Sequence, residues 1–83
     1  MEISRILREI SSILADLIDV PSVELGLQTT AHDVEGWDSL IHMQFIVAIE
    51  KHFGIRFTSA EIQGFQKVGD TCQKVQEKLG AKI

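Results

Sequence analysis

The sequence has few of the residues that build a disulfide scaffold, a metal cluster or a membrane span. Its 83 residues include one cysteine, Cys72, and three histidines, which excludes an internal disulfide and a cluster of ligands with metal-binding spacing. The longest purely apolar run covers residues 45–49, whereas a membrane-spanning helix needs about 20 apolar residues. We therefore expect a cytoplasmic protein that binds no metal and does not insert into a membrane.

Positive charge is absent from the middle of the chain. Residues 33–50 include Asp33, Glu35, Asp38 and Glu50 but no lysine or arginine, and the whole chain has a net charge of −4. This balance argues against nucleic-acid binding, which requires a basic face. An acidic surface would steer a basic partner toward this stretch; the alternative is that the charge serves solubility alone.

Apolar residues recur at helical spacing in two segments of the first two thirds. Isoleucines and leucines at three- and four-residue steps predict an amphipathic helix over residues 3–18, and Pro21 is expected to end it. Residues 38–53 predict a second helix with Asp38 as its N-cap. Gly54 is expected to end that helix in a left-handed conformation.

The last third predicts one short helix and one longer helix. Thr58 and Glu61 match a capping box, so a short helix is expected over residues 59–65. Apolar residues from Val68 to Leu79 predict a last helix of about ten residues, which Gly80 is expected to stop.

These segments together predict an all-α fold. Three longer helices and one short helix would form a four-helix bundle, with a long loop over residues 21–37 between the first two. Eighty-three residues are enough for one domain, so we assign residues 1–83 to a single domain. We expect this domain to be a monomer.

The second helix carries two apolar stripes on different sides. The predicted core stripe consists of Phe45, Ile46, Ile49 and Phe53, with His42 at its end. Leu40, Met43 and Val47 form the other stripe, beside Ser39. Because one small domain can hardly bury both sides of a helix, the second stripe is a candidate docking surface for a partner; the alternative is that another helix covers it.

Residues 36–40, Gly-Trp-Asp-Ser-Leu, open this second helix. Ser39 therefore falls in the first turn, where free N–H groups and the positive end of the helix dipole favour a phosphate. A catalytic serine needs a base that a third group orients, and His42 alone does not supply both. We predict that Ser39 is an attachment point, that no residue is catalytic and that the chain is not an enzyme.

The pattern resembles the acyl carrier proteins. The resemblance rests on residues 36–40, on Ala-Ile-Glu-Lys-His-Phe-Gly-Ile at residues 48–55, and on Val-Gly-Asp at residues 68–70. It implies that a phosphopantetheinyl transferase attaches 4′-phosphopantetheine from coenzyme A to Ser39. The arm would then carry acyl or aminoacyl groups as thioesters and present them to acyl-loading and acyl-transferring enzymes.

The resemblance also assigns roles to the neighbours of Ser39. Asp38 with Leu40, Met43 and Val47 would form the partner-docking surface. Trp37 and His42 are candidate contacts for the arm or for a cavity that shelters an acyl chain; the alternatives are that Trp37 anchors the loop and His42 packs in the core.

Ile41 and Gln44 stand where fatty-acid carriers usually have acidic residues. This difference favours a specialised biosynthetic pathway over housekeeping fatty-acid synthesis. The alternative function is an unmodified helical adaptor that binds a partner through the stripe of Leu40, Met43 and Val47.

Overall fold

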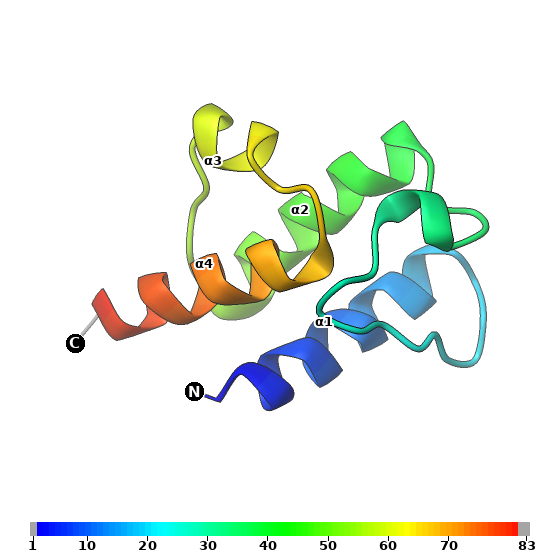
Figure 1. Ribbon diagram of the computed structural model, residues 1–83, viewed down its shortest axis with the longest axis horizontal. Helices are drawn as coiled ribbons and strands as arrows, with labels where there is room; N and C mark the ends of the chain where they lie inside the picture. Colours follow the sequence, from blue (N-terminus) through cyan, green and yellow to red (C-terminus); the bar gives the residue numbers. More distant parts are fainter. Residues whose placement is uncertain (1, 82–83) are drawn as a thin grey trace.

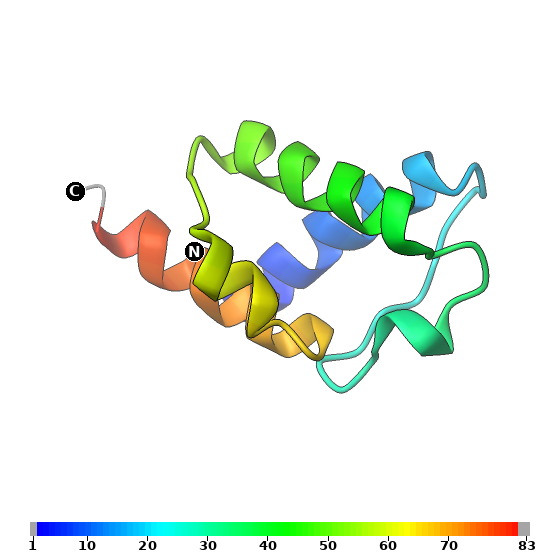
Figure 2. The same ribbon diagram turned by 90° about the horizontal axis from the view of Figure 1, so that it is seen from above.

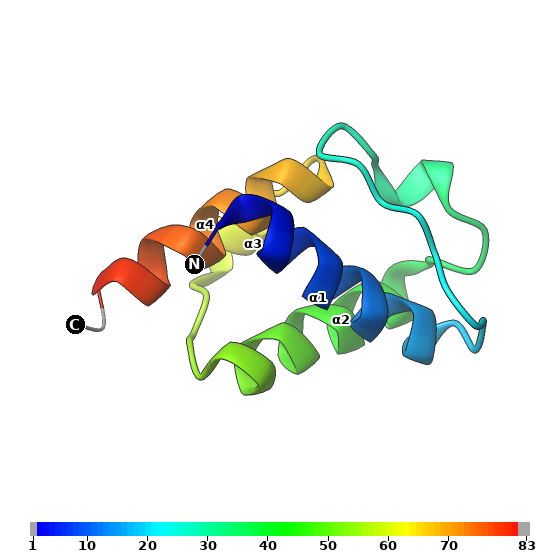
Figure 3. The ribbon, with the colours of Figure 1, turned by 90° about the horizontal axis from the view of Figure 1, so that it is seen from below.

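The computed structural model describes residues 2–81, which fold as a bundle of α-helices (Figure 1). The helices are α1 (Ile3–Leu17), α2 (Ser39–Phe53), α3 (Ser59–Gln63) and α4 (Val68–Ala81), with a 3₁₀ turn, η1 (Ala31–Asp33), before α2. Helix α1 packs against both α2 and α4, an arrangement that Figure 3 shows from below. The described residues contain no strand, so the predicted all-α class and the long loop are confirmed.

The core is formed by one face of each long helix. Ile6, Ile10 and Leu14 recur at helical spacing along α1, and all three side chains are fully buried. From α2 and α4 come Phe45, Ile46, Ile49, Cys72 and Val75, which complete this cluster. The predicted core stripe of α2 is therefore the face that points inward.

The first helix ends earlier than predicted, and not because of the proline. Its last residue is Leu17, and Asp19 follows with a left-handed φ of 59°. The N–H of Val20 donates to the carbonyl of Ala15 over 3.0 Å, as in a Schellman motif. The chain therefore leaves the helix before it reaches Pro21, since aspartate tolerates the left-handed region better than most side chains.

The end of α2 agrees with the prediction, whereas the ends of α3 and α4 differ from it. Gly54 adopts a φ of 67° and ends α2, as the sequence indicated. Thr58 and Glu61 form the predicted capping box of α3, although that helix closes at Gln63. The prediction that Gly80 stops the last helix is wrong: α4 continues to Ala81, because a glycine without a competing cap costs only about 1 kcal/mol in a helix.

The long loop is tied to the start of α4. The carbonyl oxygens of Thr29 and Leu27 accept hydrogen bonds from the N–H groups of Val68 and Gly69, each over 2.8 Å. These bonds satisfy N–H groups that the first turn of a helix leaves free. The loop crosses the end of the bundle opposite to the start of α1 and the end of α4 (Figures 1 and 2), and it delivers the chain to the start of α2.

Candidate functional site

The candidate site lies where the loop enters α2. Asp38 has an extended backbone, and its Oδ1 accepts a hydrogen bond from the N–H of Ile41 over 2.9 Å. Ser39 is the first residue of the helix and is exposed. Because Asp38 does the capping, the hydroxyl of Ser39 is left at the surface beside the positive end of the helix dipole.

Trp37 and His42 hold opposite sides of this turn together. The indole N–H of Trp37 donates to Nδ1 of His42 over 3.2 Å. The Trp37 ring is 8% exposed and packs edge-on against Phe45, with centroids 5.3 Å apart. Trp37 thus anchors the loop on the core, as the structural alternative predicted, while the hydrogen bond to His42 was not foreseen.

The hydrogen bond defines the charge state of His42. An indole N–H can only donate, so Nδ1 of His42 must accept and the imidazole proton belongs on Nε2. Burial lowers the pKa of His42 below its ordinary value of 6.5, which favours the same neutral form. His42 is half-buried at the edge of the core stripe and is not a fully buried core residue.

The second apolar stripe of α2 faces outward. Leu40, Met43 and Val47 are 68%, 53% and 43% exposed, and no helix within residues 2–81 covers them. Met43 and Val47 also line a shallow apolar groove whose opposite wall is Leu17, from the end of α1. The sequence did not reveal that Leu17 belongs to this surface, because its helical position marked it as a core residue.

Charge around the stripe is more limited than the sequence suggested. Residues 39–49 contain no aspartate, glutamate, lysine or arginine, and His42 is their one ionisable side chain. The carboxylate of Glu50 turns away to accept the N–H of Phe57, and that of Asp33 accepts the N–H of Thr30. Asp38 is therefore the acidic residue that directly adjoins Ser39.

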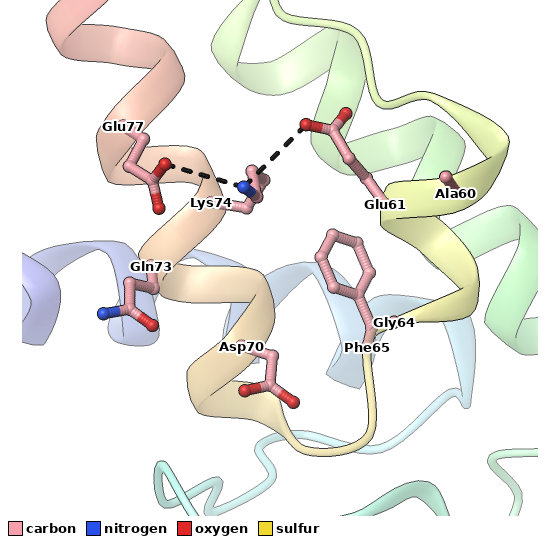
Figure 4. Close-up of a pocket in the computed structure, with 8 residues that line it drawn as sticks. All are labelled: Ala60, Glu61, Gly64, Phe65, Asp70, Gln73, Lys74 and Glu77. Carbon is pink, nitrogen blue, oxygen red and sulfur yellow. Dashed lines mark ion pairs between the residues drawn. The ribbon is translucent and has the colours of Figure 1, made fainter.

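A separate hollow lies between α3 and α4, and Figure 4 shows the side chains that line it. Lys74 stands between Glu61 and Glu77, with N–O distances of 3.9 and 3.5 Å, and the ring of Phe65 lies below them. Glu61 also pairs with Lys78 at 3.0 Å. These charges are matched with one another, so the network ties α3 to α4.

The described residues offer no reactive cysteine, metal cluster or membrane-spanning helix. Burial raises the pKa of the Cys72 thiol to about 11, so this cysteine is a packed side chain and not a nucleophile. Residues 2–81 hold no group of three or more side chains placed to bind a metal ion. Within the same residues, none of the helices has the length and apolar character needed to cross a membrane.

Comparison with known proteins shows which family the chain resembles. A family model described as "Phosphopantetheine attachment site" matches residues 8–75. The acyl carrier protein of Clostridium perfringens is 29% identical over 69 residues, which cover 83% of this chain and 91% of that protein. The acyl carrier protein of Phenylobacterium zucineum is 28% identical over 78 residues, covering 94% and 99%.

Solved structures agree with these relatives. The solution structure of the holo acyl carrier protein from Geobacter metallireducens matches with a TM-score of 0.84 and 38% identity, over 92% of this chain and 87% of that one. An acyl carrier protein from Enterococcus faecalis, at 19% identity and a TM-score of 0.70, supports the fold.

The matched region spans most of the chain and includes the exposed serine turn. Proteins of this family bear a covalent 4′-phosphopantetheine and carry groups between transferases and synthases without catalysing the reactions themselves. On this combined ground, the chain belongs to the acyl carrier protein family.

Proposed function

We propose that Ser39 is the residue that bears 4′-phosphopantetheine. The observation that supports this proposal is the exposed position of Ser39 in the first turn of α2, with Asp38 already serving as the cap. In the transfer, the Ser39 oxygen bonds to the phosphorus that carries the pantetheine arm in coenzyme A. The pyrophosphate bond breaks, adenosine 3′,5′-bisphosphate leaves, and the transferase accepts the serine proton.

The chain's own contribution is to hold the attached phosphate and to present the arm. N–H groups of the first turn and the helix dipole stabilise the negative phosphodiester. The arm supplies a thiol on which an acyl or aminoacyl group travels as a thioester. Because Ser39 lies on a rigid helix, the flexible arm keeps its cargo at high local concentration beside a docked enzyme.

We further propose that Leu40, Met43 and Val47, with Asp38 beside them, form the docking surface for those enzymes. Their exposure on one side of α2 supports this role. The absence of charged side chains from residues 39–49 means that apolar contact, more than charge pairing, must supply the affinity. This chemistry favours partner enzymes of a specialised biosynthetic pathway over those of housekeeping fatty-acid synthesis.

The attachment site is tested by intact mass after incubation with coenzyme A and a broad-specificity phosphopantetheinyl transferase. Wild type should gain one phosphopantetheine and Ser39→Ala none. Ser59→Ala is the matched control, because Ser59 is also the exposed first residue of a helix, directly after a capping Thr58; it should be modified like wild type. If unmodified wild-type protein gains nothing, Ser39 is not an attachment site and the adaptor function is favoured.

The docking surface is tested with Met43→Glu and Val47→Glu. Each places a charge at the centre of the stripe, so the KM of the transferase for the carrier should rise several-fold while the melting temperature stays nearly unchanged. Gln73→Glu, at an exposed position on α4, introduces the same charge away from α2 and controls for it. Unfolding of the two α2 variants would show that the stripe belongs to the core.

A further inference from the structure

The contact between Trp37 and His42 spans the residue that accepts the arm. Trp37 lies two residues before Ser39 and His42 lies three residues after it, and their side chains are joined by the 3.2 Å hydrogen bond. The planes of the two rings are tilted by 33° to one another, with centroids 5.9 Å apart. The first turn of α2 is therefore closed by a side-chain link in addition to its backbone hydrogen bonds.

The backbone on the loop side of this link has little rigidity of its own. Gly36, directly before Trp37, adopts a φ of 90°, which is open to glycine but strained for other residues. The residues from Gly36 to Asp38 make one backbone bond to the loop, from the N–H of Trp37 to the carbonyl of Val34 over 3.3 Å. The side chain of Trp37 is thus the main anchor of the segment that leads into Ser39.

We propose that the Trp37–His42 hydrogen bond is a clasp that holds Ser39 in the conformation in which it accepts phosphopantetheine. His42 acts here as a positioning residue, since it touches Trp37 and not the reacting phosphorus. The inference rests on the proposed attachment at Ser39. It predicts that breaking the clasp slows the transfer step without weakening the docking of the transferase.

The clasp is open to control by pH. A proton on Nδ1 of His42 would place two donors against each other and break the hydrogen bond. The ionisable residues near His42 in the sequence are Asp38, which caps α2, and His32, Asp33 and Glu35 on the loop; Glu50, Lys51 and His52 lie at the other end of α2. None of them forms an ion pair with His42, and burial alone lowers its pKa from 6.5. The clasp is therefore closed at neutral pH and opens as pH falls below 6.5 through the lowered pKa.

Three variants separate the clasp from general folding. His42→Ala removes the acceptor, and Trp37→Phe removes the donor while retaining a ring against Phe45. His42→Asn keeps an acceptor, because its amide oxygen can take the place of Nδ1, but it does not titrate in this range. Thermal melts by circular dichroism establish that each variant is folded at the assay temperature.

The assay is the rate of phosphopantetheine transfer from coenzyme A by the broad-specificity transferase. His42→Ala and Trp37→Phe should lower kcat about five-fold, the effect of one net hydrogen bond, with an unchanged KM for the carrier. His42→Asn should stay within about two-fold of wild type at neutral pH. The ratio of the wild-type kcat to the His42→Asn kcat cancels the transferase's own pH dependence. This ratio should fall as the pH drops below 6.5 and the lowered pKa of His42 is passed.

Fluorescence of Trp37, the single tryptophan of the chain, reports on the same equilibrium without the transferase. Its emission should change over the titration of His42 and stay constant in His42→Asn. If wild type is modified and His42→Ala is modified at the same kcat, the clasp is refuted and the attachment site stands. If wild type gains no phosphopantetheine, the proposed attachment fails and the clasp fails with it.

Discussion

Replacing Gly69 by alanine tests how the loop is joined to α4. A Cβ at this position would lie 2.7 Å from the carbonyl oxygen of Leu27 and 3.2 Å from its Cβ. The same carbonyl accepts the N–H of Gly69 over 2.8 Å. The added methyl group therefore forces the loop away from the helix, and the adjacent bond from Val68 to Thr29 is strained with it.

The expected cost follows from these contacts. Two hydrogen bonds are worth about 1 kcal/mol each, and overpacking adds about 1–3 kcal/mol. The better helix propensity of alanine offsets about 1 kcal/mol of this loss. Gly69→Ala should thus lower the free energy of unfolding by about 2–4 kcal/mol, which in a domain of this size lowers the melting temperature by at least about 8 °C.

The assay is urea unfolding followed by circular dichroism, with the midpoint and the slope fitted together. Gly80→Ala is the matched control, since it makes the same change in the same helix where a Cβ would meet no atom within 4 Å. It should leave the midpoint unchanged or raise it. If Gly69→Ala is as stable as wild type, Leu27 does not approach α4 as closely as the structure shows.

Three further predictions concern the rest of the scaffold. Since burial raises the pKa of Cys72 to about 11, a thiol reagent at neutral pH should titrate one thiol in native holo protein, that of the arm, and two after denaturation; two in the native state would contradict the burial. Asp19→Gly should stabilise the protein by about 0.5–1 kcal/mol by relieving the left-handed φ, and a lower melting temperature would refute this explanation. Nε2 of His52 donates to Oε1 of Glu9 over 2.7 Å and lowers the pKa of that carboxyl below 4.5. This lowered pKa gives stability that is present above pH 4.5 and lost as pH falls through the folded-state value. Glu9→Gln should remove that pH dependence and lower the free energy of unfolding by less than about 1 kcal/mol. A melting temperature with the same acid dependence as wild type would contradict this prediction.

The helices were predictable because their signals are local. A stripe at three- and four-residue steps fixes which face of α1 is buried, and Thr58 with Glu61 marks the start of α3. The exposed stripe of α2 was also accessible, since a domain of this size cannot bury both sides of one helix. The start of η1 also has a local signal, because Thr30 and Asp33 have the spacing of a capping box and form one.

The features that the sequence did not reveal depend on approach between segments. In the sequence, Gly69 stands out only as part of the Val-Gly-Asp motif, whereas the physical reason for a glycine there is the Leu27 carbonyl that lies against it. The Trp37–His42 hydrogen bond joins a loop residue to a helix residue five positions on, and no helical periodicity connects such a pair. The end of α1 at Asp19 was missed because aspartate is a weaker signal than glycine for a left-handed residue.

The Gly69 and Trp37 contacts fix the middle and the end of the long loop by different means, and the difference can be measured. The middle of the loop is tied to α4 at Gly69, and its end is tied to α2 by Trp37. The two ties share no partner residue, so their effects on the free energy of unfolding should add within about 0.5 kcal/mol. In the double variant Gly69→Ala with His42→Ala, stability should therefore fall by the sum of the single effects. The kcat of phosphopantetheine transfer, measured below the melting transition, should equal that of His42→Ala alone. A further fall in kcat would show that Gly69 also positions Ser39 and that the loop transmits strain along its length.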